Sequence, residues 1–307
     1  MAHDHDDART ASRRALALAL VFTASYTAVE VVGGLFAGSL ALLADAVHML
    51  SDNVALALAL VATWLATRPA TPERTYGYKR AEVLAALANG VLLVALAIWI
   101  FVEAGMRLRD PGDVLGGWML AIALLGIVVN VAAGLVLSRA RSHSLNVEAA
   151  FRHVFADLLG SVGVAVAAVV ILATGWVEAD PLVSIHIGVL VLVSTWSILR
   201  DSTAILLESA PRGIDADALG QRLASAPGVV EVHDLHVWTI TSGFPALSAH
   251  VLVSPGEDCH GRRRELERLL RDEFGIEHTT LQVDHRDDVL PTSALGRRIR
   301  PHRGRPH

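Results

Sequence analysis

Six long apolar stretches constrain this chain more than any other feature. A helix needs about 20 residues to cross a hydrocarbon core of about 30 Å, and each stretch is at least that long. The sequence is 53% apolar and 19% charged, with a mean hydropathy of +0.47, which excludes an ordinary soluble domain of this length. We therefore expect an α-helical membrane protein with six transmembrane helices, near residues 15–37, 39–67, 81–108, 114–140, 147–174 and 180–205.

The distribution of Lys and Arg predicts the orientation of these helices. Nine basic residues lie before the first stretch, between the second and third, and between the fourth and fifth, whereas the opposite side has only Arg107 and Arg109. Basic loops stay in the cytoplasm, so both termini are expected there. The start of the chain carries Asp4, Asp6 and Asp7, which is unlike a cleavable signal peptide. The single cysteine, Cys259, excludes an intramolecular disulfide and a cysteine-rich zinc site.

The composition changes to that of a soluble domain after the sixth stretch. Hydrophobic patterns predict a helix, two strands, a helix and a third strand, in the order αββαβ, and thus an α+β domain with a small open sheet and helices on one face. These elements are expected at 215–226, 229–240, 247–253, 261–274 and 279–283. The expected domains are a cytoplasmic N-terminal segment (1–14), a six-helix transmembrane domain (15–206), a cytoplasmic metal-binding regulatory domain (207–290) and a disordered basic tail (291–307).

One five-residue pattern, His-x-x-x-Asp, occurs in both the second and the fifth apolar stretch. It comprises His48 with Asp52 and His153 with Asp157. Residues four apart share a helix face, so each copy points an imidazole and a carboxylate in one direction. Two facing helices would supply two nitrogens and two oxygens, a complete tetrahedral set for zinc.

The alternative is that each of these residues is an isolated polar group with local hydrogen bonds. Ionisable groups at membrane depth cost at least about 2.5 kcal/mol each unless they are paired or hydrated, and four of them at a repeated spacing favour a metal site near the midplane. For Asp45, one turn before His48, three roles stay open: a fifth ligand, a carboxylate in an entry vestibule, or a residue near the outer surface. Glu30 and Glu103 are expected to reach water near helix ends.

Together, these motifs resemble the cation diffusion facilitator family, zinc-type branch. The resemblance rests on the two His-x-x-x-Asp pairs, on residues 76–82 (Tyr-Gly-Tyr-Lys-Arg-Ala-Glu) and on residues 232–238 (Val-His-Asp-Leu-His-Val-Trp). It implies a homodimeric exporter of zinc or a similar divalent cation, driven by inward movement of protons. His48, Asp52, His153 and Asp157 then become the transport ligands, and His48 favours zinc over harder metals.

The resemblance further implies a regulatory zinc (Zn²⁺) site in the cytoplasmic domain. His233, His250 and Asp284 match its pattern, with His260 and His285 as additional candidates. Ordinary surface histidines are the alternative for each of them. The resemblance also places an opposite-charge pair near Arg80 and Glu208.

Two other classes of protein compete with a transporter. A membrane-embedded metalloenzyme needs an open coordination position and a general base, and the sequence has no His-Glu-x-x-His motif. A metal sensor without transport would use the cytoplasmic domain as its main site. We therefore predict a zinc efflux transporter that is not an enzyme, with metal, protons, the lipid bilayer and a second copy of the chain as partners and no nucleic acid. The segment between the fourth and fifth stretches has only one histidine, which favours a bacterial inner membrane.

Overall fold

The computed structural model describes residues 21–138, 145–285 and Ile299. Its contacts divide the chain into two units, Met1–Leu60 with Ala88–Leu199, and Val61–Leu87 with Arg200–His307. The predicted N-terminal segment 1–14 lies outside the described residues, as does the predicted tail 291–307 apart from Ile299.

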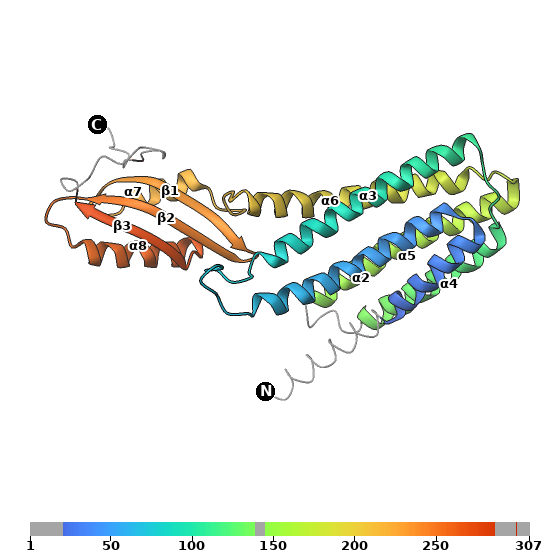
Figure 1. Ribbon diagram of the computed structural model, residues 1–307, viewed down its shortest axis with the longest axis horizontal. Helices are drawn as coiled ribbons and strands as arrows, with labels where there is room; N and C mark the ends of the chain where they lie inside the picture. Colours follow the sequence, from blue (N-terminus) through green and yellow to red (C-terminus); the bar gives the residue numbers. More distant parts are fainter. Residues whose placement is uncertain (1–20, 139–144, 286–298, 300–307) are drawn as a thin grey trace, which may run out of the picture. The chain divides into compact units, whose positions relative to one another are not determined.

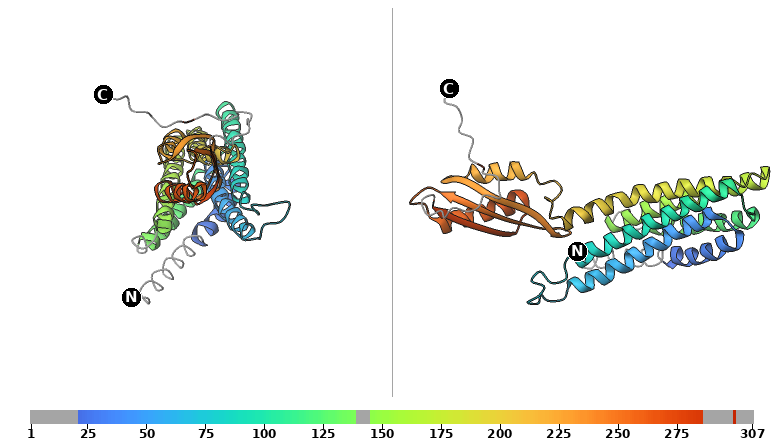
Figure 2. Two further views of the ribbon diagram at one scale, coloured as in Figure 1. Left: turned by 90° about the vertical axis from the view of Figure 1, so that its left-hand side faces the viewer. Right: turned by 45° about the horizontal axis from the view of Figure 1, so that its top comes forward.

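The first unit consists of long, mainly parallel or antiparallel helices (Figures 1 and 2). Within the described residues, four helical segments are long and apolar enough to span a membrane, and two shorter apolar segments accompany them. This confirms a helical membrane domain, whereas the count of six spans stays a prediction. The helices that build it are the segment Val21–Ala37, α2 (Leu40–Ala66), α3 (Ala81–Arg109), α4 (Gly116–Ser138), α5 (Leu145–Thr174) and α6 (Ala179–Leu206).

The surface of this unit carries many large apolar side chains. Val32, Val128 and Val193 are 68%, 64% and 69% exposed, while small residues such as Ala44 and Ala168 fill the contacts between helices. Close helix packing through small residues and an apolar outer surface are typical of membrane helices. Such an outer surface fits contact with the hydrocarbon chains of a lipid bilayer.

A buried carboxylate fixes the start of α2. Asp180, at the start of α6, is fully buried and accepts hydrogen bonds from the Ser39 hydroxyl at 2.5 Å and from the backbone N–H groups of Leu40 and Ala41 at 2.8 and 3.1 Å. Arg107 lies 3.8 Å from the same carboxylate. A carboxylate at a helix N-terminus satisfies otherwise unpaired N–H groups and complements the helix dipole. This contact holds the helix that carries His48.

The second unit contains a three-stranded sheet with helices on one face. The elements run α7 (Ala216–Ala224), β1 (Val229–Thr241), β2 (Phe244–Val253), α8 (Cys259–Phe274) and β3 (His278–His285). The strands lie in the order β1-β2-β3, with β1 antiparallel and β3 parallel to β2. The helices cover the face that carries the core residues Leu219, Leu223, Val232, Val251, Leu266 and Leu270. The alternate residues of each strand point to the opposite face.

Two details of this unit differ from the sequence-based expectation. The second strand begins at Phe244, three residues before the expected start at 247. Pro245 is part of this strand and pairs with Thr239, which is possible because proline is tolerated at the start of a strand. The connection is a turn with Gly243 at φ +71°. Ile299, in the predicted disordered tail, is 7% exposed and exchanges two backbone hydrogen bonds with Val232, so the prediction of disorder does not hold at this residue.

Candidate metal sites

The membrane unit brings three of the four predicted transport residues together. His48 Nε2 lies 3.9 Å from Asp157 Oδ1, and His153 Nε2 lies 3.6 Å from Asp157 Oδ2. The two imidazole ring centroids are 6.2 Å apart. The α2 and α5 helices therefore place two imidazoles on either side of one buried carboxylate. Asp52 lies on α2, and its side chain falls outside the described part of the chain.

These N–O distances would suit a zinc ion if the side chains moved slightly closer together. Zinc–ligand bonds of about 2.0–2.2 Å in a tetrahedron place two ligand atoms about 3.3–3.5 Å apart. The N–O distances at Asp157 exceed that by a few tenths of an ångström. Among the described residues, no group of three or more His, Cys, Asp or Glu side chains is close enough to hold a metal ion, so His48, His153 and Asp157 form an open arrangement.

The structure corrects the environment expected for two other acids in this unit. Glu30, expected to reach water, is 0% exposed. Asp45 is 2% exposed, so it does not lie at an outer surface, and its roles as a fifth ligand or an entry-path carboxylate stay predictions. Glu103 is partly exposed and pairs with Arg107 at 3.0 Å. Packing of the neighbouring helices buries Glu30 and Asp45, and such burial cannot be deduced from distance to a helix end.

The open face of the sheet in the second unit carries the predicted regulatory residues. His233 on β1 pairs directly with His250 on β2, and their ring centroids are 5.4 Å apart. Asp284 on β3 pairs with Leu252, two residues beyond His250 on the same face. Cross-strand neighbours on one face are within reach of each other's side chains. The register therefore groups His233, His250 and Asp284 on the face opposite the helices.

Two further candidates do not join this group. His285 follows Asp284 and points to the helix side, where its Nε2 lies 3.6 Å from Cys259 Sγ and 3.1 Å from the Glu257 carbonyl oxygen. The two-residue period of a strand makes this separation unavoidable. His260 is exposed in the first turn of α8, and no contact among the described residues joins it to His233 or His250.

One residue beside the regulatory group was missed by the sequence analysis. Asp234 has φ +52° at an irregularity in β1. Its carboxylate lies 3.1 Å from His236 Nε2 and 3.8 Å from His250 Nε2. A left-handed non-glycine residue is uncommon, and aspartate is among those that tolerate it. The signal in the sequence was the His-Asp-x-His arrangement of residues 233–236, but its geometry depends on this irregularity.

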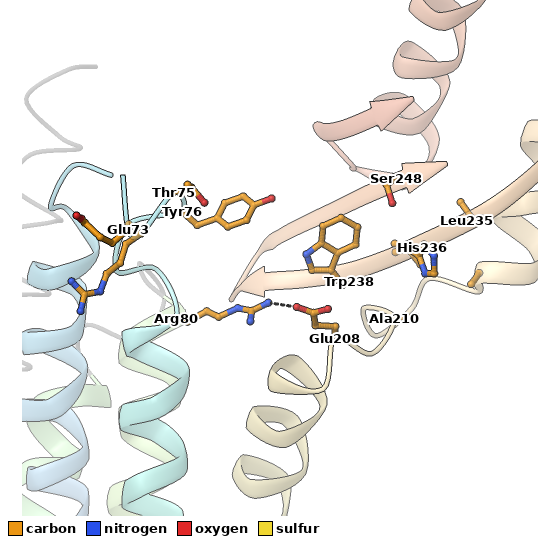
Figure 3. A pocket seen from close by; sticks show the side chains of 14 residues that line it. Glu73, Thr75, Tyr76, Arg80, Glu208, Ala210, Leu235, His236, Trp238 and Ser248 are labelled. Atoms are coloured by element: carbon orange, nitrogen blue, oxygen red, sulfur yellow. Dashed lines mark hydrogen bonds and ion pairs between the residues drawn. The ribbon is translucent and has the colours of Figure 1, made fainter. Parts of the chain in front are cut away.

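The predicted charge pair between Arg80 and Glu208 is confirmed. Arg80 Nη2 lies 2.9 Å from Glu208 Oε1, and both side chains are exposed. Glu208 adopts φ +56° just after α6. Figure 3 shows this pair at the edge of a cavity of 720 Å³ that Tyr76 and Trp238 also line. None of the predicted metal residues whose side chains the structure describes lines this cavity, so its size does not identify the functional site.

Apolar helices with His and Asp converging between them define a membrane protein that handles metal cations. Residues 16–207 match the family described as cation efflux transmembrane domain, and residues 211–286 match the cation efflux protein cytoplasmic domain. The chain therefore belongs to the cation diffusion facilitator family, zinc-type branch, whose members are metal cation transporters and not enzymes.

Similar proteins come from several bacteria. The metal cation efflux system protein CzcD of Cupriavidus metallidurans is 42% identical over 286 residues, covering 92% of this chain and 89% of the relative. The zinc transporter ZitB of Escherichia coli is 41% identical over 309 residues, covering 98% of each chain. A cadmium, cobalt and zinc/H⁺-K⁺ antiporter of Bacillus subtilis is 38% identical over 289 residues and 92% of each chain. A solved structure of the metal-bound C-terminal domain of CzcD is 33% identical, covers 23% of this chain and 99% of that one, and has a TM-score of 0.22.

Proposed function

We propose that this protein exports zinc by exchanging it for protons at a site formed by His48, Asp52, His153 and Asp157. The observation that carries the proposal is the convergence of His48 and His153 on the buried carboxylate of Asp157. The names of the relatives, which include zinc transporters and a metal/proton antiporter, support the same function. Two imidazoles with carboxylate oxygens suit zinc better than magnesium or calcium.

The exchange follows from the chemistry of the ligands. Zinc binds neutral imidazole and ionised carboxylate, so protons and metal compete for the same atoms. An ordinary imidazole titrates at about pH 6.5, which places this competition close to physiological pH. The chain's own role is to hold the imidazoles and the carboxylate in register on α2 and α5. No covalent step is required.

The proposal includes the remaining architecture. Six spans place both termini in the cytoplasm of a bacterial inner membrane, with domains at 1–14, 15–206, 207–290 and 291–307. His233, His250 and Asp284 bind a regulatory zinc ion in the cytoplasmic domain, and two copies of the chain form the working unit. The shared sheet face of these three residues supports the regulatory site.

Zinc flux in vesicles tests the proposal. Purified protein is reconstituted into liposomes, the membrane potential is held at zero, and pH gradients of either sign are imposed. Zinc should move toward the side of higher proton concentration, and should drive protons the opposite way when only a zinc gradient is present. Zinc binding without zinc flux would contradict transport and favour a metal sensor. Zinc flux that does not depend on the pH gradient would contradict the exchange for protons.

A further inference from the structure

Three buried side chains of the membrane unit each leave one oxygen atom without a hydrogen-bond partner. They are Glu30 in the helical segment Val21–Ala37, Asp45 on α2 and Asn130 on α4, and they are 0%, 2% and 1% exposed. Glu30 Oε2, Asp45 Oδ2 and Asn130 Oδ1 receive no hydrogen bond from the described residues. Burying a polar atom without a partner costs free energy. At membrane depth, such groups mark functional sites by default.

Asp45 lies one helical turn away from the predicted metal ligands. It precedes His48 by three residues and therefore shares its helix face. On α5, a Cβ atom on Gly160 would lie 3.0 Å from Asp45 Oδ1, and Gly160 follows Asp157 by three residues. The approach of His48 to Asp157 and the contact at Gly160 are thus one turn apart on both helices, so α2 and α5 run antiparallel. The second contact lies toward the start of α2 and the end of α5.

Further polar contacts connect α5 to α4 and to Glu30. A Cβ atom on Gly126 would lie 3.0 Å from Ser161 Oγ and 2.3 Å from Tyr26 Oη, so both hydroxyls approach the same point of α4. Tyr26 donates to Glu30 Oε1 at 2.9 Å, and Asn130 Nδ2 donates to Ser161 Oγ at 3.3 Å. Ser161 is the next residue of α5 after the glycine that faces the α2 carboxylate. The polar groups therefore form a continuous series that starts beside the metal ligands.

No basic side chain balances the two carboxyl groups in the described part of the chain. Neither Glu30 nor Asp45 forms an ion pair with a described Lys, Arg or His residue. A divalent cation between the helices would supply this positive charge and would bind the free lone pairs of all three oxygens.

We propose that Glu30, Asp45 and Asn130 form an oxygen-only transit site for the divalent cation, between the metal ligands and the end of the bundle at which α2 starts. The inference rests on the proposed zinc transport, in whose orientation this end faces the outside. Carboxylate and amide oxygens suit harder cations such as manganese better than they suit zinc. Zinc is therefore held more weakly here than by the imidazoles, and a weaker second site allows the ion to leave.

Manganese (Mn²⁺) binding tests the transit site directly, because this ion prefers oxygen ligands and is detected by electron paramagnetic resonance. The parent protein is the full-length variant with His153→Ala and His250→Ala, which lacks one imidazole at each predicted metal site. In this parent, Glu30→Gln should weaken Mn²⁺ binding about tenfold, and Asn130→Asp should strengthen it about tenfold, because affinity follows the number of charged ligands. Asp113→Asn, which removes an exposed carboxylate between α3 and α4, is the matched control and should bind Mn²⁺ as the parent does.

Zinc flux through the otherwise unchanged chain provides the second readout. Glu30→Gln should leave equilibrium zinc binding within about twofold, because the four predicted ligands are intact, and should lower zinc uptake about tenfold. Asn130→Asp should also lower uptake, because an ion that is held more tightly leaves more slowly. Opposite effects of the two substitutions on Mn²⁺ affinity, with the same direction of effect on zinc flux, are not expected from a general loss of folding.

The result that would overturn the transit site is an Mn²⁺ affinity that neither substitution changes. If Glu30→Gln does not assemble, Asn130→Asp decides the point alone, since an affinity equal to that of the parent would exclude Asn130 from the site. A wild-type protein that moves no zinc, although both substitutions change Mn²⁺ binding as expected, would support the binding site and overturn the proposed transport instead.

Discussion

The two predicted metal sites use the same residue types, His and Asp, but one site is built on helices and the other on strands. In the membrane unit, the four-residue spacing on α5 places His153 beside Asp157, and the approach of α2 to α5 brings His48 to the same carboxylate. The Asp157 side chain is 2% exposed, whereas those of His48 and His153 are 24% and 46% exposed. In the second unit, strand register brings His233 beside His250, with side chains 13% and 30% exposed. The first site lies where charge must be balanced at every step. The second site faces water, which screens an uncompensated ion.

This difference assigns different work to the two sites. A site centred on a buried carboxylate gains a divalent ion at the expense of protons or other charge, which would couple metal to proton flux. A set on an open sheet face would bind or release metal with the metal concentration of the surrounding solution. We therefore expect changes in the membrane site to affect transport itself, and changes on the sheet to affect its regulation.

The largest effect is expected from Asp157→Ala. Both imidazoles approach this carboxylate, so its loss removes the centre of the site, and zinc uptake should fall about 100-fold or more. Insertion into the membrane should be preserved, since removing a charge from a span lowers its insertion cost. Zinc flux in vesicles, with Asp113→Ala as the control, measures this. Near-normal uptake would contradict the assignment.

His48→Asp should change selectivity more than rate. Replacing an imidazole with a harder oxygen ligand should shift the preference from zinc toward cadmium or manganese by about tenfold, equivalent to roughly 1.4 kcal/mol. Competition between metals during uptake gives the ratio directly. A ratio equal to that of the wild type would show that His48 does not set the preference.

His250→Ala should reveal the regulatory site on the sheet. The full-length variant should bind about one zinc ion fewer per chain, while uptake at saturating zinc stays within about twofold. His278→Ala is the control, because the His278 ring packs against Tyr76 and Phe244. A tenfold loss of uptake at saturating zinc in His250→Ala would contradict the proposal that the sheet site regulates transport without taking part in it.

A smaller effect is expected from the exposed pair Arg80–Glu208. Exposed ion pairs contribute about 0–1 kcal/mol, so each alanine variant should lower unfolding stability by no more than that. In a double-mutant cycle, the double variant should lose little beyond either single variant. Strictly additive losses would show that the contact observed at 2.9 Å has no energetic coupling.

The smallest effect concerns the start of α8. Backbone N–H groups of Gly261 and His260 hold the pKa of Asp258 below its ordinary value of 3.8. The ionised carboxylate therefore stabilises the folded state above that pH, and the contribution disappears as the pH falls through the lowered pKa. Amide hydrogen exchange in the first turn of α8 should lose protection in acid, and Asp258→Asn should flatten this pH dependence. Identical pH dependence in the two proteins would contradict the assignment.

Parts of both sites could be predicted from the sequence because local periodicity governs them. The four-residue spacing of His153 and Asp157 fixed their common face, and the apolar runs indicated where helices form. The choice between Asp284 and His285 required the register of β3, because one residue reverses the face. Asp234 could not be anticipated, since its position depends on a left-handed irregularity within β1.

The chain's own sequence determined the membrane class, the repeated ligand pairs and their family, since each depends on composition or on spacing along one helix. Tertiary structure alone decided which polar groups are buried together. Glu30 lay near a predicted helix end and was expected in water, yet packing places it fully buried, with a hydrogen bond from the Tyr26 hydroxyl. Burial is set by the neighbours that a residue meets in space, and those neighbours come from helices that the local pattern does not specify.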